Sequence, residues 1–382
     1  MTDFFDYDRL TFPEVAALPR HTPLVIPLGA GYDLARLASA LGDPPRAGLL
    51  PAIPYGWHGS GLAVPQEKLR PLLLNLVDSL REDGFSQVFI LTPQDAGLEL
   101  GLASLRLAHP SQYAEPALLP PDAARGKVIV IPVGHTEQHA YHLPMSTDTL
   151  IIDAIGRGVA QTLPDAAFTL PVMPYGVSTH RQAFAGTLNC GGRAFEDFWV
   201  ALIDLLAGRG FDRFYLINGH GGNHSFLVNV VKYAGERHRR VFCATAWLYL
   251  SSEPWVQTLS AHRQSKIGGM GHAGELETSL ILHLRPDLVH LEKAVDEIDF
   301  VSTPNYYMDW VEGGSLIANP PWDDDSATGA YGAGTLGTTE KGSLWLATAI
   351  EEKCAHVAEI HEQHTRREEK RRAGFGRWGA LR

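Results

Sequence analysis

The sequence predicts an α/β fold in which a mostly parallel sheet is flanked by helices, with this unit present twice and the N-terminal copy shortened. From residue 128 onward, short apolar runs alternate with longer amphipathic runs, which is typical of βαβ units. Three segments of the first 125 residues also recur, in the same order, between residues 131 and 218. With 382 residues, the chain is long enough for two domains.

The second unit is predicted to alternate strands with helices. Its apolar run VIVIPV indicates a buried strand, and the amphipathic run that starts at Asp148 indicates a helix. The expected series is strand 128–133, helix 148–163, strand 168–173, helix 194–208, strand 213–217, a helix from about 223, strand 240–247 and a last helix from about 338 to 367. Segments 251–270 and 300–335 are expected to be long loops that cover an active site.

The repeated segments lie at the ends of the predicted strands. IPLG at 26–29 matches IPVG at 131–134, LPAIPYG at 50–56 matches LPVMPYG at 170–176, and GFSQVFILT at 84–92 matches GFDRFYLIN at 210–218. The offset grows from 105 to 120 to 126 residues, as small deletions in the first copy would produce. We interpret this as an internal duplication with a boundary near residue 125. The alternative is two unrelated domains whose strands end in similar Pro-Gly segments.

Composition favours a globular protein with a small-molecule substrate. Hydrophobic residues make up 45% and charged residues 20% of the chain. A formal charge of −11 argues against a nucleic-acid partner, because binding to phosphates needs a basic surface. The three scattered cysteines suit a reducing compartment, and the sequence has neither a basic leader nor a long apolar run. We therefore expect a cytoplasmic protein with no membrane partner.

The densest polar cluster is GHTEQHAYHLP at 134–144, directly after the predicted strand 128–133. Ligands bind at the carboxyl edge of an open parallel sheet, so a site is expected here. Glu137 and His139 alternate by two and need a bend in the loop to point the same way, whereas Asp148 can reach in from the helix start. Carboxylate with imidazole is a ligand set for zinc or manganese, although such residues also occur in ordinary polar loops.

Two further clusters are expected on the same rim. NGHGGNH at 218–224 follows another predicted strand, where glycines let the backbone approach an ion or substrate; a glycine-rich turn with a helix cap at Asn223 is the alternative. GGMGHAGELET at 268–278 joins a loop to a helix that ends before Pro286. His272 and Glu275 are three residues apart and share a face if the helix has begun, whereas Glu277 points elsewhere.

Together, these clusters supply enough carboxylates and imidazoles for two divalent ions that share a bridging carboxylate. Such a pair lowers the pKa of a bound water and stabilises the oxygen that becomes negative. The sequence contains no GxSxG nucleophile elbow and no P-loop. Metal-activated water is therefore the predicted chemistry.

The motifs VGHTEQHAYHLPMSTD, NGHGGN and GHAGELETSLILHLRPDLV resemble those of the creatininase (creatinine amidohydrolase) family. YGVSTHRQAFAGTLN at 175–189 resembles the segment between the first two, and YGAGTLGTTEKG at 331–342 fits more loosely. The resemblance covers residues 128–290. It implies a creatininase-like fold, a dinuclear metal-dependent hydrolase and a homo-oligomer.

The resemblance also implies roles for single residues. Residues 137, 139 and 148 reproduce the spacing of the Glu, His and Asp that bind two metals in the family. Glu137 and His220 would hold one ion and His139 the other, with Asp148 as the bridge. His272 would be the general acid or base, and Glu275 would both bind metal and orient water. The expected substrate-binding residues are Ser178, His180, His142 and Gly221. Zn²⁺ or Mn²⁺ is the expected metal, and Fe²⁺ also suits such ligands.

Two departures from the family pattern bear on the substrate. Creatininase has a Glu two residues after the histidine of the second motif, where this chain has Gly222. Glu275 is expected to compensate, since relatives with NGHGG carry a Glu three residues after the HAG histidine. Gly268 and Gly269 stand where creatininase has Trp and Asp. We therefore do not expect creatinine to be the substrate.

The first copy departs further from the metal-binding pattern. Aligned on the matched segments, the positions of Glu137, His139 and His220 hold Tyr32, Leu34 and Gln94. Tyrosine and glutamine are poor metal ligands and leucine is none. Residues 1–125 are thus predicted to form a degenerate domain without metal ligands, and residues 126–382 the catalytic domain.

The favoured hypothesis is hydrolysis of a C–N bond in a small cyclic amide, lactam or formamide by metal-bound hydroxide. One alternative keeps the site but hydrolyses a C–C bond beside a ketone in an oxidised cyclic polyol of the keto-inositol type. Another alternative, an inactive metal-binding assembly protein, is disfavoured by the presence of His272.

Overall fold

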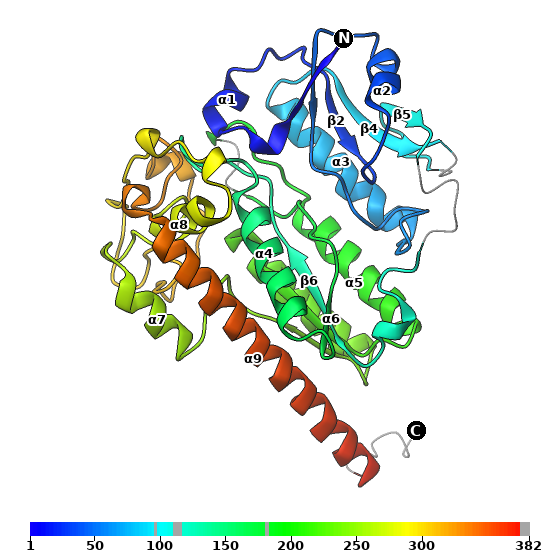
Figure 1. Cartoon of the computed structure of the whole chain (residues 1–382), viewed down its shortest axis with the longest axis vertical. Coiled ribbons are helices and arrows are strands. Elements are labelled where there is room, and N and C mark those ends of the chain that lie inside the picture. The colour runs from blue at the N-terminus through cyan, green and yellow to red at the C-terminus, as the bar shows by residue number, and fades with distance from the viewer. Residues whose placement is uncertain (95–97, 110–116, 180–182, 375–382) are drawn as a thin grey trace.

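The computed structural model describes residues 1–94, 98–109, 117–179 and 183–374, and it has one parallel sheet in each half of the chain (Figure 1). The N-terminal sheet has the strand order β1-β3-β2-β4-β5. Its strands are β1 (Asp3–Asp6), β2 (Leu24–Pro27), β3 (Arg46–Leu49), β4 (Val88–Pro93) and β5 (Ser104–Leu107), and its helices are α1 (Phe12–Ala16), α2 (Leu34–Ala40) and α3 (Gln66–Glu82).

The second sheet has the strand order β7-β6-β8-β9. Its strands are β6 (Val128–Val133), β7 (Ala167–Thr169), β8 (Arg213–Asn218) and β9 (Phe242–Thr245). The helices of this half are α4 (Thr147–Thr162), α5 (Gly192–Gly208), α6 (His224–Arg237), α7 (Trp255–His262), α8 (Glu275–Leu284) and α9 (Thr339–Arg372). Short 3₁₀ turns occur at Tyr7–Arg9, Asp122–Ala124, Gly221–Asn223, Pro286–Leu288, Leu291–Lys293, Trp322–Asp324 and Gly334–Leu336.

The position of β6 explains its composition. All six of its residues are buried, because it pairs with β7 on one side and β8 on the other while helices cover the sheet.

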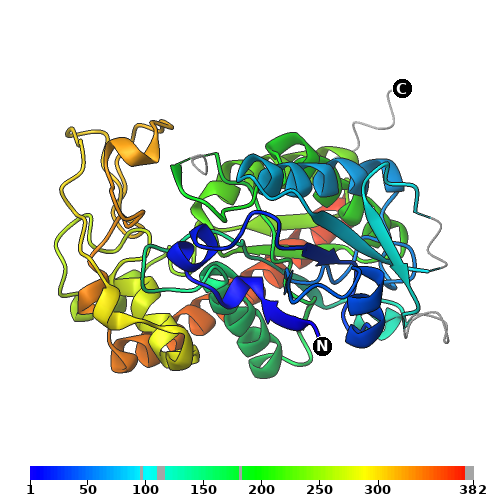
Figure 2. The ribbon, with the colours of Figure 1, turned by 90° about the horizontal axis from the view of Figure 1, so that it is seen from above.

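α9 packs against α4 and α8 and then extends beyond the sheet (Figure 1). The yellow and orange segments between about residues 250 and 335 stand at one end of the molecule (Figure 2). Among the described residues, no helix is both long and apolar enough to span a membrane.

The two sheets share a strand order beyond the extra strand β1. In each, the strand that opens the repeat is central and pairs in parallel with the next two strands of that repeat. The matched segments even form equivalent isolated bridges, Leu28 with Ile53 and Val133 with Met173. This topology agrees with the duplication predicted from the sequence, which remains a prediction.

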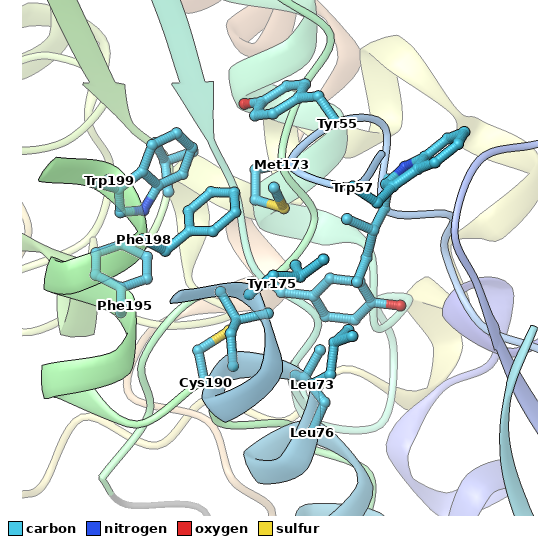
Figure 3. Packing of buried hydrophobic residues seen from close by; sticks show 14 of the residues in the cluster. Tyr55, Trp57, Leu73, Leu76, Met173, Tyr175, Cys190, Phe195, Phe198 and Trp199 are labelled. Atoms are coloured by element: carbon cyan, nitrogen blue, oxygen red, sulfur yellow. The ribbon is translucent and has the colours of Figure 1, made fainter. Parts of the chain in front are cut away.

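One hydrophobic core spans both halves of the chain (Figure 3). Helices α3 and α5 pack against each other across it. Tyr175 donates a hydrogen bond of 2.5 Å to the carbonyl of Pro51, so the matched segments of the two halves of the chain meet directly. At Gly56, an added Cβ would lie 2.6 Å from the ring of Phe198, which explains the glycine at this contact. The N-terminal unit is therefore packed onto the second unit through a continuous core.

Most predicted elements of the second unit are present, with three differences. Segment 251–270 is not all loop, because α7 lies within it; Trp255 and Leu259 are four residues apart, and Leu259 is buried. The strands expected at 168–173 and 240–247 are shorter, at Ala167–Thr169 and Phe242–Thr245. The last helix continues to Arg372, because its charged C-terminal turns form ion pairs along the helix, such as Glu362 with Arg366.

Candidate metal centre

The polar clusters of the second unit meet at the carboxyl edge of its sheet. β6 and β8 are neighbours, so the segments that follow Val133 and Asn218 lie close together. These segments carry Glu137, His139 and His220. The other members are Asp148 in the first turn of α4, Glu277 in the first turn of α8, and His272 in the loop before α8. All six side chains are buried.

Asp148 stands between two imidazoles. Its Oδ1 lies 3.1 Å from Nε2 of His139, and its Oδ2 lies 3.1 Å from Nδ1 of His220. Tyr249 donates a hydrogen bond of 3.2 Å to Oδ1. Each carboxylate oxygen thus faces a different histidine, which is the geometry a bridging carboxylate needs.

Backbone carbonyls fix the tautomers of three histidines. Nδ1 of His139 contacts the carbonyl of Glu137 at 3.1 Å, and Nε2 of His220 contacts that of Val177 at 3.1 Å. Nε2 of His272 contacts the carbonyl of Gln138 at 2.6 Å. Because a carbonyl only accepts, each of these nitrogens carries a proton, and the other nitrogen of each ring faces the centre, where it can bind a cation. This is the usual arrangement of metal-ligating histidines.

The donor atoms fit a pair of cations. Three overlapping groups have ligand atoms within 4.8 Å of one another: His135, Glu137 and His220; Glu137, His139 and His272; and His139, Asp148 and Glu277. Oδ2 of Asp148 is buried without a hydrogen bond. Nδ1 of His220 lies 3.1 Å from that oxygen, and such a contact requires a proton or a metal ion between the two atoms. Buried carboxylates and imidazoles are ligands for Zn²⁺ and Mn²⁺.

The pKa values of the cluster reflect its crowded charges. Burial opposes the charged imidazoles, yet the Asp148 carboxylate raises the pKa of His139 to about 9, and the Glu137 and Asp148 carboxylates raise that of His220 to about 10. Burial raises the pKa of Glu277 to about 7. Without cations, the carboxylates are therefore compensated by protons on the histidines, and divalent ions would displace those protons.

Glu275 does not join the cluster, which corrects the expectation from the sequence. Its carboxylate is buried against Lys341, 2.6 Å away, and accepts the backbone N–H groups of Gln264 and Ser265. The helix begins only at Glu275, so His272 precedes it and the spacing of three does not place the two side chains on one face. Glu277, which we expected to point elsewhere, lies 3.7 Å from Nε2 of His139 instead.

The four expected substrate-binding residues differ in their position relative to the candidate metal centre. Ser178 is buried beside Val177, whose carbonyl holds His220. Gly221 faces the rings of Trp310 and Trp247. His142 contacts Thr278 on α8 with its Nε2 and is in none of the three ligand groups. His180 lies outside the described residues.

The long loop 300–335 contributes two tryptophans that sequence reasoning did not assign. Nε1 of Trp310 donates a hydrogen bond of 3.1 Å to Glu277, and the ring of Trp322 meets that of His272 edge-on at 5.2 Å. Trp310 also lines a cavity of about 520 Å³, together with His224, Trp247, Tyr306, Tyr307 and Leu316. The many Trp and Gly residues of this loop were the available indication of a functional role. The sequence did not show which residues the loop would contact.

The model of the creatininase family, described as creatinine amidohydrolase, matches residues 119–357, well over half of the chain. The chain belongs to the creatininase family. A solved creatinine amidohydrolase (creatininase) superposes with a TM-score of 0.53 at 27% identity, covering 62% of this chain and 92% of that chain. Other solved creatininases are described as Zn-Zn and Mn forms.

Curated relatives within this family differ in what their names say they act on. The mycofactocin precursor peptide peptidase of Mycobacterium ulcerans is 35% identical over 170 residues, covering 42% of this chain and 60% of the relative. The creatinine amidohydrolase of Pseudomonas putida is 32% identical over 187 residues, covering 46% and 70%. The 3-dehydro-scyllo-inosose hydrolase of Thermotoga maritima is 28% identical over 200 residues, covering 50% and 61%. Family membership therefore leaves the substrate open.

Residues 1–118, most of the N-terminal unit of this creatininase-family chain, lie outside the family match. Its Tyr32 donates to the carbonyl of Leu28, and Leu34 and Gln94 are exposed. Within the described part of the chain, all three groups of potential ligands come from residues 135–277.

Proposed function

We propose that this chain is a dinuclear metal-dependent hydrolase that opens a C–N bond in a small cyclic amide, lactam or formamide. The observation that carries the proposal is Asp148, whose two oxygens each lie 3.1 Å from a ring nitrogen of a different histidine. In this proposal, Glu137, His220 and Asp148 hold one ion, and His139, Asp148 and Glu277 hold the other. Two divalent ions, Zn²⁺, Mn²⁺ or Fe²⁺, would activate water and polarise the scissile carbonyl.

His272 is proposed as the general acid or base. Its Nε2–H is held by the Gln138 carbonyl, so Nδ1 can accept a proton from the nucleophile and return it to the leaving nitrogen. This Nδ1 lies 3.3 Å from Oε1 of Glu137, beside the proposed ions. Ser178 and Gly221 stay proposed as substrate contacts, because Gly221 directly follows His220 and Ser178 follows Val177, whose carbonyl contacts His220.

Glu277 supplies the carboxylate that Gly222 lacks. A Cβ at residue 222 would lie 2.3 Å from the Val177 carbonyl and 2.5 Å from Nε2 of His220, so this backbone admits no side chain there. Glu277 reaches the centre from α8 instead. Because the ligand set differs here from that of creatininase, we propose a substrate other than creatinine.

Two alternatives to a cyclic amide, lactam or formamide substrate are each favoured by a relative of this chain. The mycofactocin precursor peptide peptidase relatives favour an acyclic peptide amide, which the same residues could hydrolyse. The inosose hydrolase relative favours C–C bond cleavage in an oxidised cyclic polyol. An inactive assembly protein is disfavoured, because His272 is held with a free lone pair at the centre.

The test is a substrate panel on protein stripped with a chelator and reloaded with Zn²⁺ or Mn²⁺. Cyclic amides, formamides, short peptides and keto-inositols would be assayed by mass spectrometry of the products. We expect turnover of an amide in loaded protein and none in stripped protein. Turnover of only the keto-inositols would favour the alternative reaction, and full activity without metal would refute the mechanism.

We further propose that residues 1–125 are a degenerate copy without metal and residues 126–382 the catalytic domain. The shared strand order and the absence of ligand groups from the described part of residues 1–125 support this division. Elemental analysis should find about two ions per chain, whereas two working copies would give four. Gln94→Ala should leave the metal content unchanged. The inert copy is also proposed to occupy the place of a neighbouring subunit, which predicts a smaller oligomer than single-unit relatives form.

A further inference from the structure

His135 is a fourth buried histidine at the candidate metal centre, beside His139, His220 and His272. It lies two residues after the end of β6 at Val133, and it is fully buried. Its ring lies 4.3 Å from that of His220, measured between centroids. Its Nε2 lies 3.8 Å from Oε2 of Glu137 and has no hydrogen-bond partner. By position alone, His135 could be either a ligand or a hydrogen-bond donor.

The backbone N–H of Gly176 decides between these roles. It donates a hydrogen bond of 2.9 Å to Nδ1 of His135. A nitrogen that accepts a hydrogen bond bears a lone pair, so the neutral ring carries its one proton on Nε2. His139, His220 and His272 have the opposite arrangement, because the outward nitrogen of each donates to a carbonyl, which leaves the inward nitrogen able to bind a cation. Of these four histidines, His135 is the one whose outward nitrogen accepts, so its inward nitrogen must carry the N–H when the ring is neutral.

The donor that fixes this tautomer is itself held firmly. The carbonyl of Gly176 accepts the N–H of Cys190 at 2.8 Å, and the next residue, Val177, donates to Oδ1 of Asn223 at 2.9 Å. The amide of Asn223 in turn donates to the carbonyl of Gly134, next to His135. A Cβ at residue 176 would lie 2.3 Å from Oδ1 of Asn223, so only glycine allows this clamp.

We propose that His135 is a neutral hydrogen-bond donor to Oε2 of Glu137, and that it positions this carboxylate instead of binding a metal ion. Oε1 of Glu137 faces His220 and His272 at 3.3 Å, so Oε1 is the oxygen turned toward the ligand cluster. Oε2 faces His135, and closing the 3.8 Å gap by less than 1 Å would form a hydrogen bond. Ligating carboxylates are commonly held in this way by a second partner. The inference rests on the proposed metal site.

The first test measures the tautomer directly in the wild-type protein. Protein labelled with ¹⁵N in histidine would be studied by long-range ¹H–¹⁵N correlation, with the His135 signals assigned by their loss in His135→Gln. We expect a proton on Nε2 both before and after Zn²⁺ is added. A proton on Nδ1, or loss of the Nε2 proton on adding Zn²⁺, would overturn the proposal. This readout needs no substrate, so it stands even if no hydrolase activity is found.

The second test compares two variants by zinc titration and elemental analysis. His135→Phe keeps a ring but removes both nitrogens, whereas His135→Gln retains an acceptor for Gly176 and a donor for Glu137. We expect two ions per chain in both, an affinity ~10–100-fold weaker in the Phe variant, and recovery to within ~3-fold in the Gln variant. Loss of one ion in both variants would identify His135 as a ligand. Unchanged affinity in a folded Phe variant would refute the positioning role.

Discussion

Replacing Glu277 with Gln tests whether Glu277, and not Glu275 as the sequence suggested, binds metal at the candidate centre. The substitution keeps the shape of the side chain and one of its two acceptor oxygens, so it can accept from either Trp310 or the N–H of Ala273, which donate to different oxygens of Glu277. It removes the negative charge that lies 3.7 Å from Nε2 of His139. Glu275→Gln is the matched control, because that carboxylate lies two residues away on the same helix turn and pairs with Lys341.

The expected size of the effect follows from the geometry. A unit negative charge ~4 Å from a divalent cation, at an effective dielectric constant of ~20, gives roughly 8 kcal/mol of attraction. Desolvation of the buried carboxylate cancels several kcal/mol of this. A net loss of ~3 kcal/mol remains, which is ~10²-fold in metal affinity. Glu275→Gln should instead leave metal affinity within ~3-fold and lower the free energy of unfolding by roughly 3 kcal/mol, because it breaks a buried ion pair.

The assay is zinc titration by calorimetry with elemental analysis, alongside urea unfolding of the metal-free proteins. Glu277→Gln should weaken or lose one ion while the metal-free protein unfolds near the wild-type midpoint. Glu275→Gln should unfold earlier and still bind two ions. The opposite pattern, with metal lost from Glu275→Gln and retained by Glu277→Gln, would refute the assignment and restore the one expected from the sequence.

Three further predictions concern other groups. Asp148→Ala should lose both ions by elemental analysis, because no carboxylate would then separate the two cations; retention of two ions would contradict the bridge. His272→Ala should keep both ions but lower kcat by ~10²–10⁴, and loss of an ion would make it a ligand. Burial raises the pKa of Asp8 to about 6, so above pH 6 the folded state holds a charge that it disfavours, and this penalty vanishes below about pH 4. Asp8→Asn should therefore raise Tm at pH 8, by the equivalent of ~1 kcal/mol after allowing for its partial exposure, and change Tm little at pH 4; an equal shift at both values would exclude the ionisation as its cause.

The sequence by itself determined most of the second unit and the central part of its site. The run Val128–Val133 is apolar because it is buried on both faces, and it forms β6 at the predicted residues. The spacing of Glu137, His139 and Asp148 resembles that of the family's metal ligands, and this resemblance predicted that they meet. Adjacent strand ends then bring in His220, because β6 and β8 are parallel neighbours. These features depend on local periodicity and on a general rule about the edges of parallel sheets.

Only the tertiary structure decided which side chains complete the site. Glu277 rather than Glu275 enters because α8 begins at residue 275, a boundary set by packing and not by the sequence pattern. Trp310 and Trp322 arrive from a loop whose path no periodicity encodes. The tautomer of His135 depends on the N–H of Gly176, 41 residues away. Each of these contacts joins segments that are distant along the chain. Their geometry is therefore fixed by tertiary packing, to which local sequence preferences are blind; α8 and Trp310, for example, pack in a second hydrophobic core formed by the second unit.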